Sequence, residues 1–329
     1  MITTLEMSQR LPLRHKWPGL LLGSLLALVM VVPLQADQKS VNESKKAAMD
    51  GRVRITIERG DLEVHGWDKN QILVKGKLDE KTKEFIFDVD GDDTVIAVKI
   101  PESRGGWGRA NGSDLIIYLP RKSEVDIGSV STDIKLEDLR GGIDLGTVSG
   151  DVTARNLSGR ISLTSVSGEV DLRQAEGRIV AKSVSGNVDV RESKGDHRLN
   201  SVSGELLIRG AEGEFELTSV SGDLEILDVT FSRMNGGTVS GDVDIEATML
   251  GGGRLDMESV SGSVRVEFLK PVDARFDLET ASGRIVNRIT DDKPRKSKYI
   301  RDEVLRFVVK SGKGEVTLSS RSGDVIVSQ

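Results

Sequence analysis

The sequence predicts an all-β protein: a single-domain parallel β-solenoid whose 18-residue coils consist of two nine-residue halves. Three observations predict it. The phrase SVSG recurs every 18 residues, apolar and polar residues alternate within each nine, and aromatic residues make up only 4% of the 329 residues. An internal repeat of this length is typical of solenoids, and alternation with a period of two is typical of strands. A core poor in aromatic side chains is built from Val, Ile and Leu, which favours strands.

The phrase SVSG marks the repeat. Its valines follow one another at steps of 18 from Val130 to Val220, and the series continues through Val239, Val260 and Ala281 at steps of 19, 21 and 21. Stacked coils place equivalent residues about 4.8 Å apart. We expect these valines to point into the core, with Ser and Thr on either side forming two outward columns of hydroxyls. The residues expected to define the coils are Val148, Gly150, Val166, Gly168, Val184, Gly186, Val202, Gly204, Val220, Gly222, Val239, Gly241, Val260 and Gly262.

Each coil contains two short strands, and both contribute apolar columns to the core. The first half supplies columns that include Val152 and Ala154, and the second half supplies columns that include Ile161 and Leu163. The glycine of each phrase, such as Gly168, is expected where a Cβ would crowd the opposite strand or where a bulge needs a positive φ. We therefore expect the repeat to determine the fold, and not primarily to provide a reactive site.

The first 36 residues differ in kind from the rest. A basic stretch, the apolar run GLLLGSLLALVMVV and the small residue Ala36 follow in the order of a secretory signal peptide. Because this apolar run is shorter than the roughly 20 residues that span a bilayer, we expect cleavage and no transmembrane segment in the mature chain.

The expected location is the periplasm or cell surface of a bacterium. The expected organisation is a signal peptide at 1–36, a polar linker at 37–50 and a solenoid domain at 51–329, divided into irregular coils at 51–129, regular coils at 130–238, and looser coils with a C-terminal cap at 239–329.

The ends of the solenoid and the charge of the chain bear on its partners. Arg321 stands at the valine position of the last repeat, which suits a terminal coil that faces water, and open coil ends allow end-to-end self-association. Removing residues 1–36 takes three basic residues and one acidic residue from the chain's 46 and 52, which leaves a net charge of −8. This balance disfavours nucleic acid as a partner. The chain has no cysteine, so it has neither disulfides nor a cysteine-linked lipid anchor.

Candidate catalytic and metal-binding residues are scarce. After residue 36 only His65 and His197 remain, and no metal-ligand spacing accompanies them, so we expect no catalytic residue, metal or cofactor. His197 falls in an apolar column and predicts a buried structural histidine, whereas His65 has no evident partner. An acidic column could be read as a calcium site, but it lacks the GGxGxD loop and favours solvated turn residues. Its members are Asp133, Asp151, Glu169, Asn187, Glu205, Asp223 and Asp242.

A column of arginines is the candidate binding site. Arg155, Arg173, Arg191 and Arg209 occupy one outward position of four successive coils. Four guanidinium groups at this spacing could bind an anionic envelope polymer through bidentate contacts. Alternatively, each arginine pairs with a neighbouring acid such as Asp171 and keeps the stack soluble.

Several phrases outside the strict repeat are shared with a known group of proteins. These phrases are DLEVHGWD near the start, IIYLP before the repeats and GEVTLSSRSGDVIV at the end. Together with the tandem repeats, residues 50–329 resemble the bacterial putative-adhesin family, a domain of unknown function with SVSGDV repeats on a β-solenoid. This resemblance implies the same fold and brings no catalytic residues.

The sequence thus predicts an exported, non-enzymatic envelope interaction or scaffold protein, adhesin-like, whose partner is an envelope polymer or an envelope protein. The alternative is a polysaccharide lyase or hydrolase of the parallel β-helix type. An enzyme of that type requires carboxylates grouped in a groove. That groove is expected under the insertions at 231–254 or 287–304.

Overall fold

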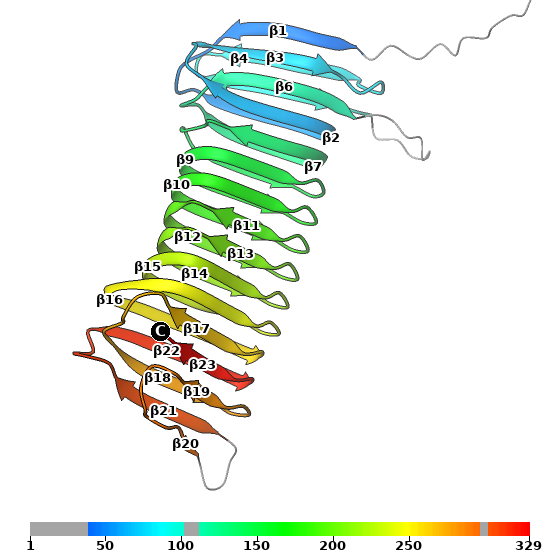
Figure 1. Ribbon diagram of the computed structural model, residues 1–329. Helices are drawn as coiled ribbons and strands as arrows, with labels where there is room; N and C mark the ends of the chain where they lie inside the picture. Colours follow the sequence, from blue (N-terminus) through cyan, green and yellow to red (C-terminus); the bar gives the residue numbers. More distant parts are fainter. Residues whose placement is uncertain (1–38, 102–111, 297–301) are drawn as a thin grey trace, which may run out of the picture. The chain divides into compact units, whose positions relative to one another are not determined.

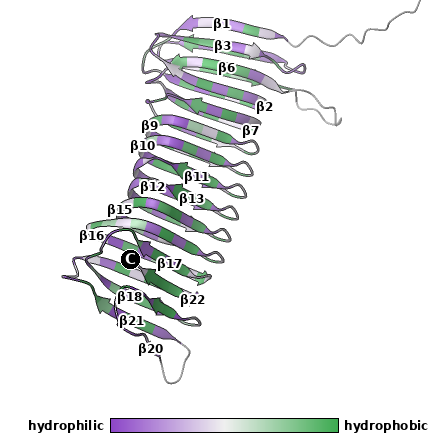
Figure 2. Ribbon diagram, viewed as in Figure 1, coloured by the Kyte–Doolittle hydropathy of each residue, from purple (hydrophilic) through white to green (hydrophobic). Residues whose placement is uncertain are grey.

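The computed structural model describes residues 39–101, 112–296 and 302–329, and the expected signal peptide lies outside these residues. Asp37–Gln329 form one compact unit, and the described residues contribute 23 strands to one continuous sheet (Figure 1). Apolar and polar residues alternate along the strands, as Figure 2 shows. Among the described residues, no helix is long and apolar enough to span a membrane. The expectation of an all-β fold is confirmed.

The central strands form coils with the predicted period. Val170 pairs with Val152 on one side and Val188 on the other, in parallel register and one 18-residue step away in each direction. A residue with positive φ separates the two halves of each coil, as at Gln174 (φ 55°) and Glu192 (φ 52°). The strands of this region are β9 (Val152–Ser165), β10 (Val170–Ser183), β11 (Val188–Arg191), β12 (Lys194–Ser201), β13 (Leu206–Arg209) and β14 (Glu212–Ser219).

The core consists of the four predicted apolar columns. Val152 and Ala154 from the first half of a coil, and Ile161 and Leu163 from the second, are all at most 1% exposed. The equivalent residues of the neighbouring coils are buried in the same way. Stacked aliphatic side chains of nearly constant volume fill the space between the two strands of each coil, which explains why so few aromatic residues suffice.

The orientation of the SVSG phrase is opposite to the prediction. Its valines are exposed, for example Val184 at 43%, and the preceding hydroxyl residue is buried, for example Ser183 at 4%. Ser183 continues the inward alternation of Ile179 and Ala181, and its Oγ accepts a hydrogen bond of 2.9 Å from the amide of Gly186. The chain then turns, so that the valine projects from the corner. The hydroxyls of Ser165, Ser183, Ser201 and Ser219 each accept a hydrogen bond from the amide of the glycine three residues later. In other coils the equivalent hydroxyl, for example that of Ser259, donates to a carbonyl oxygen of the neighbouring turn.

Removing one such hydroxyl should weaken the stack measurably. We expect Ser183→Ala to lower the free energy of unfolding by about 1–2 kcal/mol, because the amide of Gly186 loses its acceptor. Ser185→Ala, which changes the exposed serine of the same turn, should lower it by less than about 0.5 kcal/mol. Urea unfolding monitored by circular dichroism measures both. Equal effects would show that the buried hydroxyl has no special role.

The glycine of the phrase is required by contact between coils, not by the opposite strand. A Cβ on Gly168 would lie 1.8 Å from the carbonyl oxygen of Gly150, and one on Gly186 would lie 2.0 Å from that of Gly168. Of these three glycines only Gly150 has a positive φ, so a positive φ does not explain the column. Each turn packs directly against the backbone of the turn before it.

The N-terminal end of the stack mixes parallel and antiparallel pairing. β2 pairs in parallel with β5, β6 and β7, whereas β1 lies antiparallel on β3, β3 on β6, and β4 on β5. The expected polar linker at 37–50 is therefore wrong, because half of it is strand β1. A polar strand that covers an edge protects it from further pairing. The strands are β1 (Ser40–Lys46), β2 (Arg52–Trp67), β3 (Gln71–Lys77), β4 (Glu84–Asp90), β5 (Asp93–Lys99), β6 (Ser113–Pro120), β7 (Glu124–Glu137) and β8 (Ile143–Thr147).

The C-terminal strands do not form the end of the stack. β22 pairs in parallel with both β16 and β18, and antiparallel β21 covers β18. Arg321 therefore lies in an internal coil, and its predicted place in the terminal coil is wrong. Strands β18 and β21, which also belong to residues 239–329, lie beyond it. The strands are β15 (Leu224–Thr238), β16 (Val243–Ser261), β17 (Val264–Phe268), β18 (Ala274–Thr280), β19 (Ile285–Asn287), β20 (Arg295–Lys296), β21 (Glu303–Val308), β22 (Gly314–Ser322) and β23 (Val325–Ser328).

Candidate functional site

The four predicted arginines form one ladder across β9, β10, β11 and β13. Arg155, Arg173, Arg191 and Arg209 are in register from strand to strand. Their outward direction follows from the inward direction of the apolar residues that precede each of them. The structure thus brings together all the residues of the predicted site.

Two of these arginines are oriented by acids on their own strands. Arg173 binds Asp171 through Nε at 2.9 Å and Nη2 at 2.6 Å, and Arg191 binds Asp189 in the same bidentate way, through Nε at 2.9 Å and through Nη2. These hydrogen bonds raise the pKa of both guanidinium groups above its ordinary value. A guanidinium carries five N–H donors, so a bidentate pair leaves three for a ligand.

The outer members of the ladder are held differently. Arg155 donates from Nε to Oε1 of Gln174 at 3.1 Å, and Arg209 makes no ion pair with any other residue that the structure describes. The ladder borders a shallow depression on the outer face of the sheet. The depression is lined by Lys135, Leu136, Glu137, Thr153, Ala154, Arg155, Asp171, Arg173, Gln174 and Glu192. Cations, carboxylates and an amide therefore meet on one rigid face.

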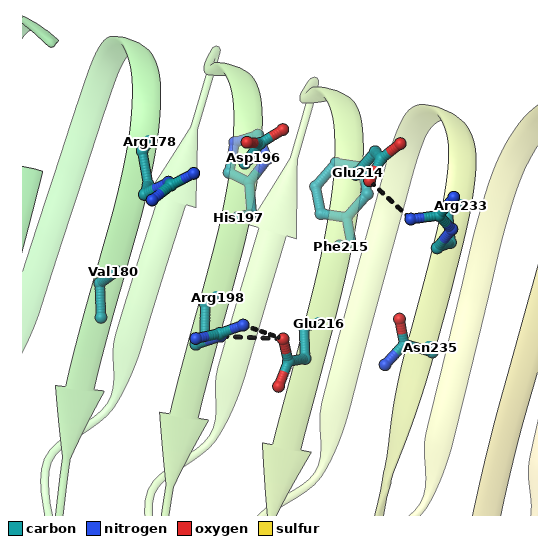
Figure 3. A pocket seen from close by; sticks show the side chains of 10 residues that line it. All are labelled: Arg178, Val180, Asp196, His197, Arg198, Glu214, Phe215, Glu216, Arg233 and Asn235. Carbon is teal, nitrogen blue, oxygen red and sulfur yellow. Dashed lines mark hydrogen bonds and ion pairs between the residues drawn. The ribbon is translucent and has the colours of Figure 1, made fainter. Parts of the chain in front are cut away.

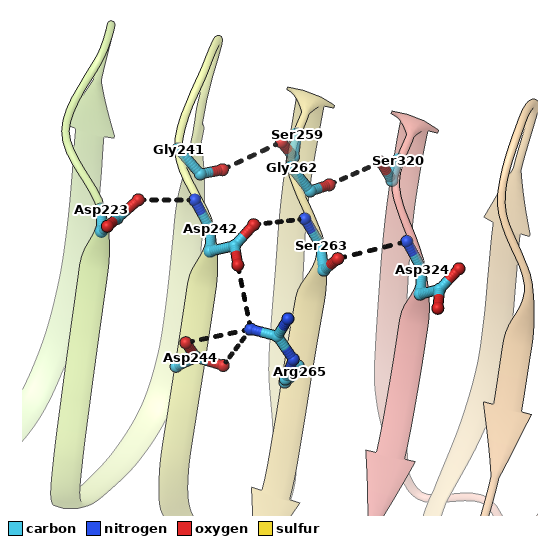
Figure 4. Close-up of polar contacts among 10 residues, drawn as sticks. All are labelled: Asp223, Gly241, Asp242, Asp244, Ser259, Gly262, Ser263, Arg265, Ser320 and Asp324. Atoms are coloured by element: carbon cyan, nitrogen blue, oxygen red, sulfur yellow. Dashed lines mark hydrogen bonds and ion pairs between the residues drawn. The ribbon is translucent and has the colours of Figure 1, made fainter.

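The aspartates and the asparagine of the acidic column have a structural role at the start of the coils, where each accepts a hydrogen bond from an amide of the next coil. Asp242 accepts a hydrogen bond of 2.8 Å from the amide of Ser263, and Asp223 accepts one of 2.8 Å from the amide of Asp242 (Figure 4). Arg265 contacts both Asp242 and Asp244, and these contacts raise its pKa. Within the described ranges no group of three or more acids, histidines or cysteines could hold a metal ion. The column links coils to one another.

His197 is a buried histidine, as its column predicts. Its ring is 2% exposed, lies 4.5 Å from the ring of Phe215, and has Nε2 2.8 Å from Oγ of Ser193. Burial lowers its pKa to about 4. Figure 3 shows the recess on the outer face beside it, where Arg198 is joined to Glu216. The histidine belongs to the core, and the charged residues that line the recess include the pairs Arg198–Glu216 and Arg233–Glu214.

His65 has partners that the sequence analysis missed. Its Nε2 lies 3.0 Å from Glu63 and its Nδ1 lies 3.1 Å from Glu137, while its ring stacks on Tyr118 at 5.2 Å. Trp67 stacks on the same tyrosine at 5.3 Å. The pairing of β2 with β6 and β7 assembles this cluster. The alternation within β2 places His65 and Trp67 on one face, but only the register between strands reveals their neighbours.

Comparison with known protein families identifies the family of this chain. Residues 41–328 match the family described as Toastrack DUF4097. The chain belongs to this family. No curated protein matches it.

Solved structures similar to this Toastrack chain are distant in sequence. A putative adhesin from Parabacteroides distasonis is 13% identical with a TM-score of 0.40, and the match covers 89% of this chain and 98% of that one. A putative adhesin from Bacteroides fragilis is 12% identical with a TM-score of 0.36, covering 90% and 100%. A putative lipid binding protein from Parabacteroides distasonis is 12% identical with a TM-score of 0.36, covering 88% and 97%.

The acids near the two insertions of this Toastrack protein lie in ion pairs or strand ladders. The insertion at 231–254 continues strands β15 and β16, and the described part of 287–304 contributes β20 and the start of β21. Glu303 is paired with Lys296 at 2.8 Å, and Asp277 is paired with Arg306 at 3.0 Å. Asp244 and Glu246 of the first segment line a depression together with Glu225 and Glu267, and Arg288 of the second segment lies at the same depression. Arg265 is paired with Asp244 at 3.0 Å within it.

Proposed function

We propose that this Toastrack protein is an exported, non-enzymatic interaction module of the bacterial envelope, and that its arginine ladder binds an envelope polymer. The observation that supports this proposal is the register of Arg155, Arg173, Arg191 and Arg209, one per coil on a rigid sheet. Stacked coils repeat the same group about every 4.8 Å. A ligand that repeats its own groups along an extended chain can engage several members of such a ladder together.

The charges around the ladder favour a polysaccharide over a densely charged polymer. Asp171 and Asp189 neutralise two of the four arginines, and Glu137 and Glu192 lie in the same depression as Arg155. Donors and acceptors thus alternate on this face, as hydroxyl-rich ligands require. The unpaired N–H groups remain available for sparse carboxylates or phosphates of such a polymer.

Co-sedimentation tests this proposal. We expect the protein from Asp37 onwards to pellet with isolated peptidoglycan sacculi or outer-membrane vesicles, and the quadruple variant Arg155→Ala, Arg173→Ala, Arg191→Ala and Arg209→Ala to bind at least about tenfold more weakly. The variant removes four exposed contacts that an extended ligand would make together, so their individually small contributions are lost at once. Running the assay across a salt series separates the contribution of ligand charge from that of hydroxyl contacts.

A matched control lies on the second strand of the coils. Arg160, Arg178, Arg198 and Arg233 lie outside the ladder, and their replacement by alanine changes the net charge by the same amount. This control should bind like the unmodified protein. Equal binding by both quadruple variants, or no binding by the unmodified protein to either material, would refute the role of the ladder.

A further inference from the structure

One edge of the coil stack carries an unbroken row of exposed valines. These residues are 40–50% exposed and make up eight of the twelve large apolar side chains that are exposed in the described part of the chain. Scattered apolar residues are normal on a surface, but a contiguous row indicates an interaction site. We name this row the valine ridge. Its members are Val130, Val148, Val166, Val184, Val202, Val220, Val239 and Val260.

Backbone hydrogen bonds hold the valine ridge in register. The amide of Ser167 donates to the carbonyl of Val148 at 3.0 Å, and the amide of Ser185 donates to that of Val166 at 2.9 Å. Similar bonds continue along the stack to Ser261. The turns that carry the ridge, such as those between β10 and β11 and between β12 and β13, lie along one edge in Figure 1. The ridge is therefore preorganised, and its association would cost little conformational entropy.

The two ends of the ridge carry opposite charges. Pairing of β2 with β7 places Glu58 beside Val130, and pairing of β16 with β22 places Arg321 beside Val260. Both charged residues are exposed, and neither forms an ion pair with another residue in the described ranges. Among the described residues, the Glu58 carboxylate accepts one weak hydrogen bond, of 3.4 Å, from the amide of Ile100. In the order of the stacked coils, Glu58 therefore lies next to the first valine of the ridge and Arg321 lies next to the last.

We propose that the valine ridge binds a second copy of this chain in antiparallel orientation. A twofold axis between Val184 and Val202 places each valine against one from the other copy, for example Val166 against Val220. The same axis brings Glu58 of each copy to Arg321 of the other. A surface that is apolar along its length and oppositely charged at its ends is complementary to its own antiparallel copy, as a twofold interface requires. In a parallel arrangement like charges would face each other.

The dimensions of the ridge indicate a weak dimer. Ten positions at about 4.8 Å span roughly 43 Å, and the contact is only about two residues wide. This area is below the roughly 800 Å² per partner of a standard interface, so we expect a dissociation constant in the micromolar range. The acids that follow each turn, such as Asp151 and Asp223, fall on the same side of both copies and repel each other. Salt at about 0.15 M screens this repulsion over roughly 8 Å.

Engineered cysteines test the orientation directly, because the natural chain contains none. Val166→Cys and Val220→Cys proteins are prepared separately and oxidised alone or as a mixture. We expect the mixture to form disulfide dimers at least about tenfold faster than either protein alone. Faster dimerisation of each protein alone would overturn the antiparallel arrangement. A mixture no faster than Arg178→Cys mixed with Glu214→Cys, which lie on the second strand, would overturn the ridge as the interface.

Charge reversal tests the ends of the ridge independently. Glu58→Arg and Arg321→Glu each replace two attractive end contacts with two repulsive ones, so each should weaken self-association about tenfold. The double variant restores opposite charges and should return to within about threefold of the unmodified protein. Sedimentation equilibrium at 0.15 M salt measures all four proteins. A double variant as weak as the singles, or singles as strong as the unmodified protein, would contradict the proposal.

Discussion

Replacing Gly186 by alanine is expected to lower the free energy of unfolding by about 3 kcal/mol. The added Cβ would lie 2.0 Å from the carbonyl oxygen of Gly168 and 2.5 Å from its carbonyl carbon. Both atoms are backbone, and they belong to a coil held by hydrogen bonds on either side, so neither can move without loosening the stack. Urea unfolding followed by far-ultraviolet circular dichroism measures the change.

Gly146→Ala is the matched control for this substitution. Gly146 has nothing within 4 Å of the position that a Cβ would take, and its φ is not in the left-handed region. Its replacement should therefore be neutral, or stabilise the protein by up to about 0.5 kcal/mol by restricting the unfolded chain. If Gly186→Ala were as stable as Gly146→Ala, the coils could not be packed as closely as the structure shows.

Acidification below pH 6.5 is expected to destabilise the protein through His197. Its pKa falls from 6.5 to about 4 on folding because the ring is buried. The unfolded chain therefore binds a proton that the folded chain does not, and the stability present above pH 6.5 is lost progressively as the pH falls towards 4. This pKa difference corresponds to roughly 3 kcal/mol. Urea unfolding at intervals between pH 7 and pH 4 measures the loss.

A variant without the histidine isolates its contribution. His197→Phe combined with Ser193→Ala removes the titrating ring together with the buried hydroxyl beside it, and a phenyl ring at this position would stack on Phe215 as the imidazole does. The dependence of stability on pH between 6.5 and 4 should be smaller in this variant by most of the expected 3 kcal/mol. An unchanged slope would show that groups other than His197 cause the acid sensitivity.

The coil and its core could be predicted because they depend on a sequence period that is visible within a few neighbouring repeats. An 18-residue interval leaves one way of aligning neighbouring coils, and alternation then assigns Val152 and Ile161 to the core. The arginine ladder follows from the same register. These features depend on residues within one coil and on a fixed step to the next.

The inverted SVSG phrase shows where local counting fails. Alternation that starts from the valine places Val184 inside, whereas alternation continued from Ile179 and Ala181 places Ser183 inside and Val184 outside, as observed. Burying the hydroxyl of Ser183 would be unfavourable if it had no hydrogen-bond partner. The turn provides one, because the amide of Gly186 donates to this hydroxyl. The chain changes direction at this turn, so alternation does not carry across it.

The sequence alone determined the all-β class, the coil length, the apolar columns and the alignment of the four ladder arginines, because each depends on period and alternation. Only the tertiary structure decided that β22 lies between β16 and β18, that β1 covers an edge, and that Glu58 and Arg321 end the valine ridge. These features depend on pairing between segments far apart in the chain. Several pairings satisfy the same alternation, and the choice among them is made by the burial and hydrogen bonding of the complete stack.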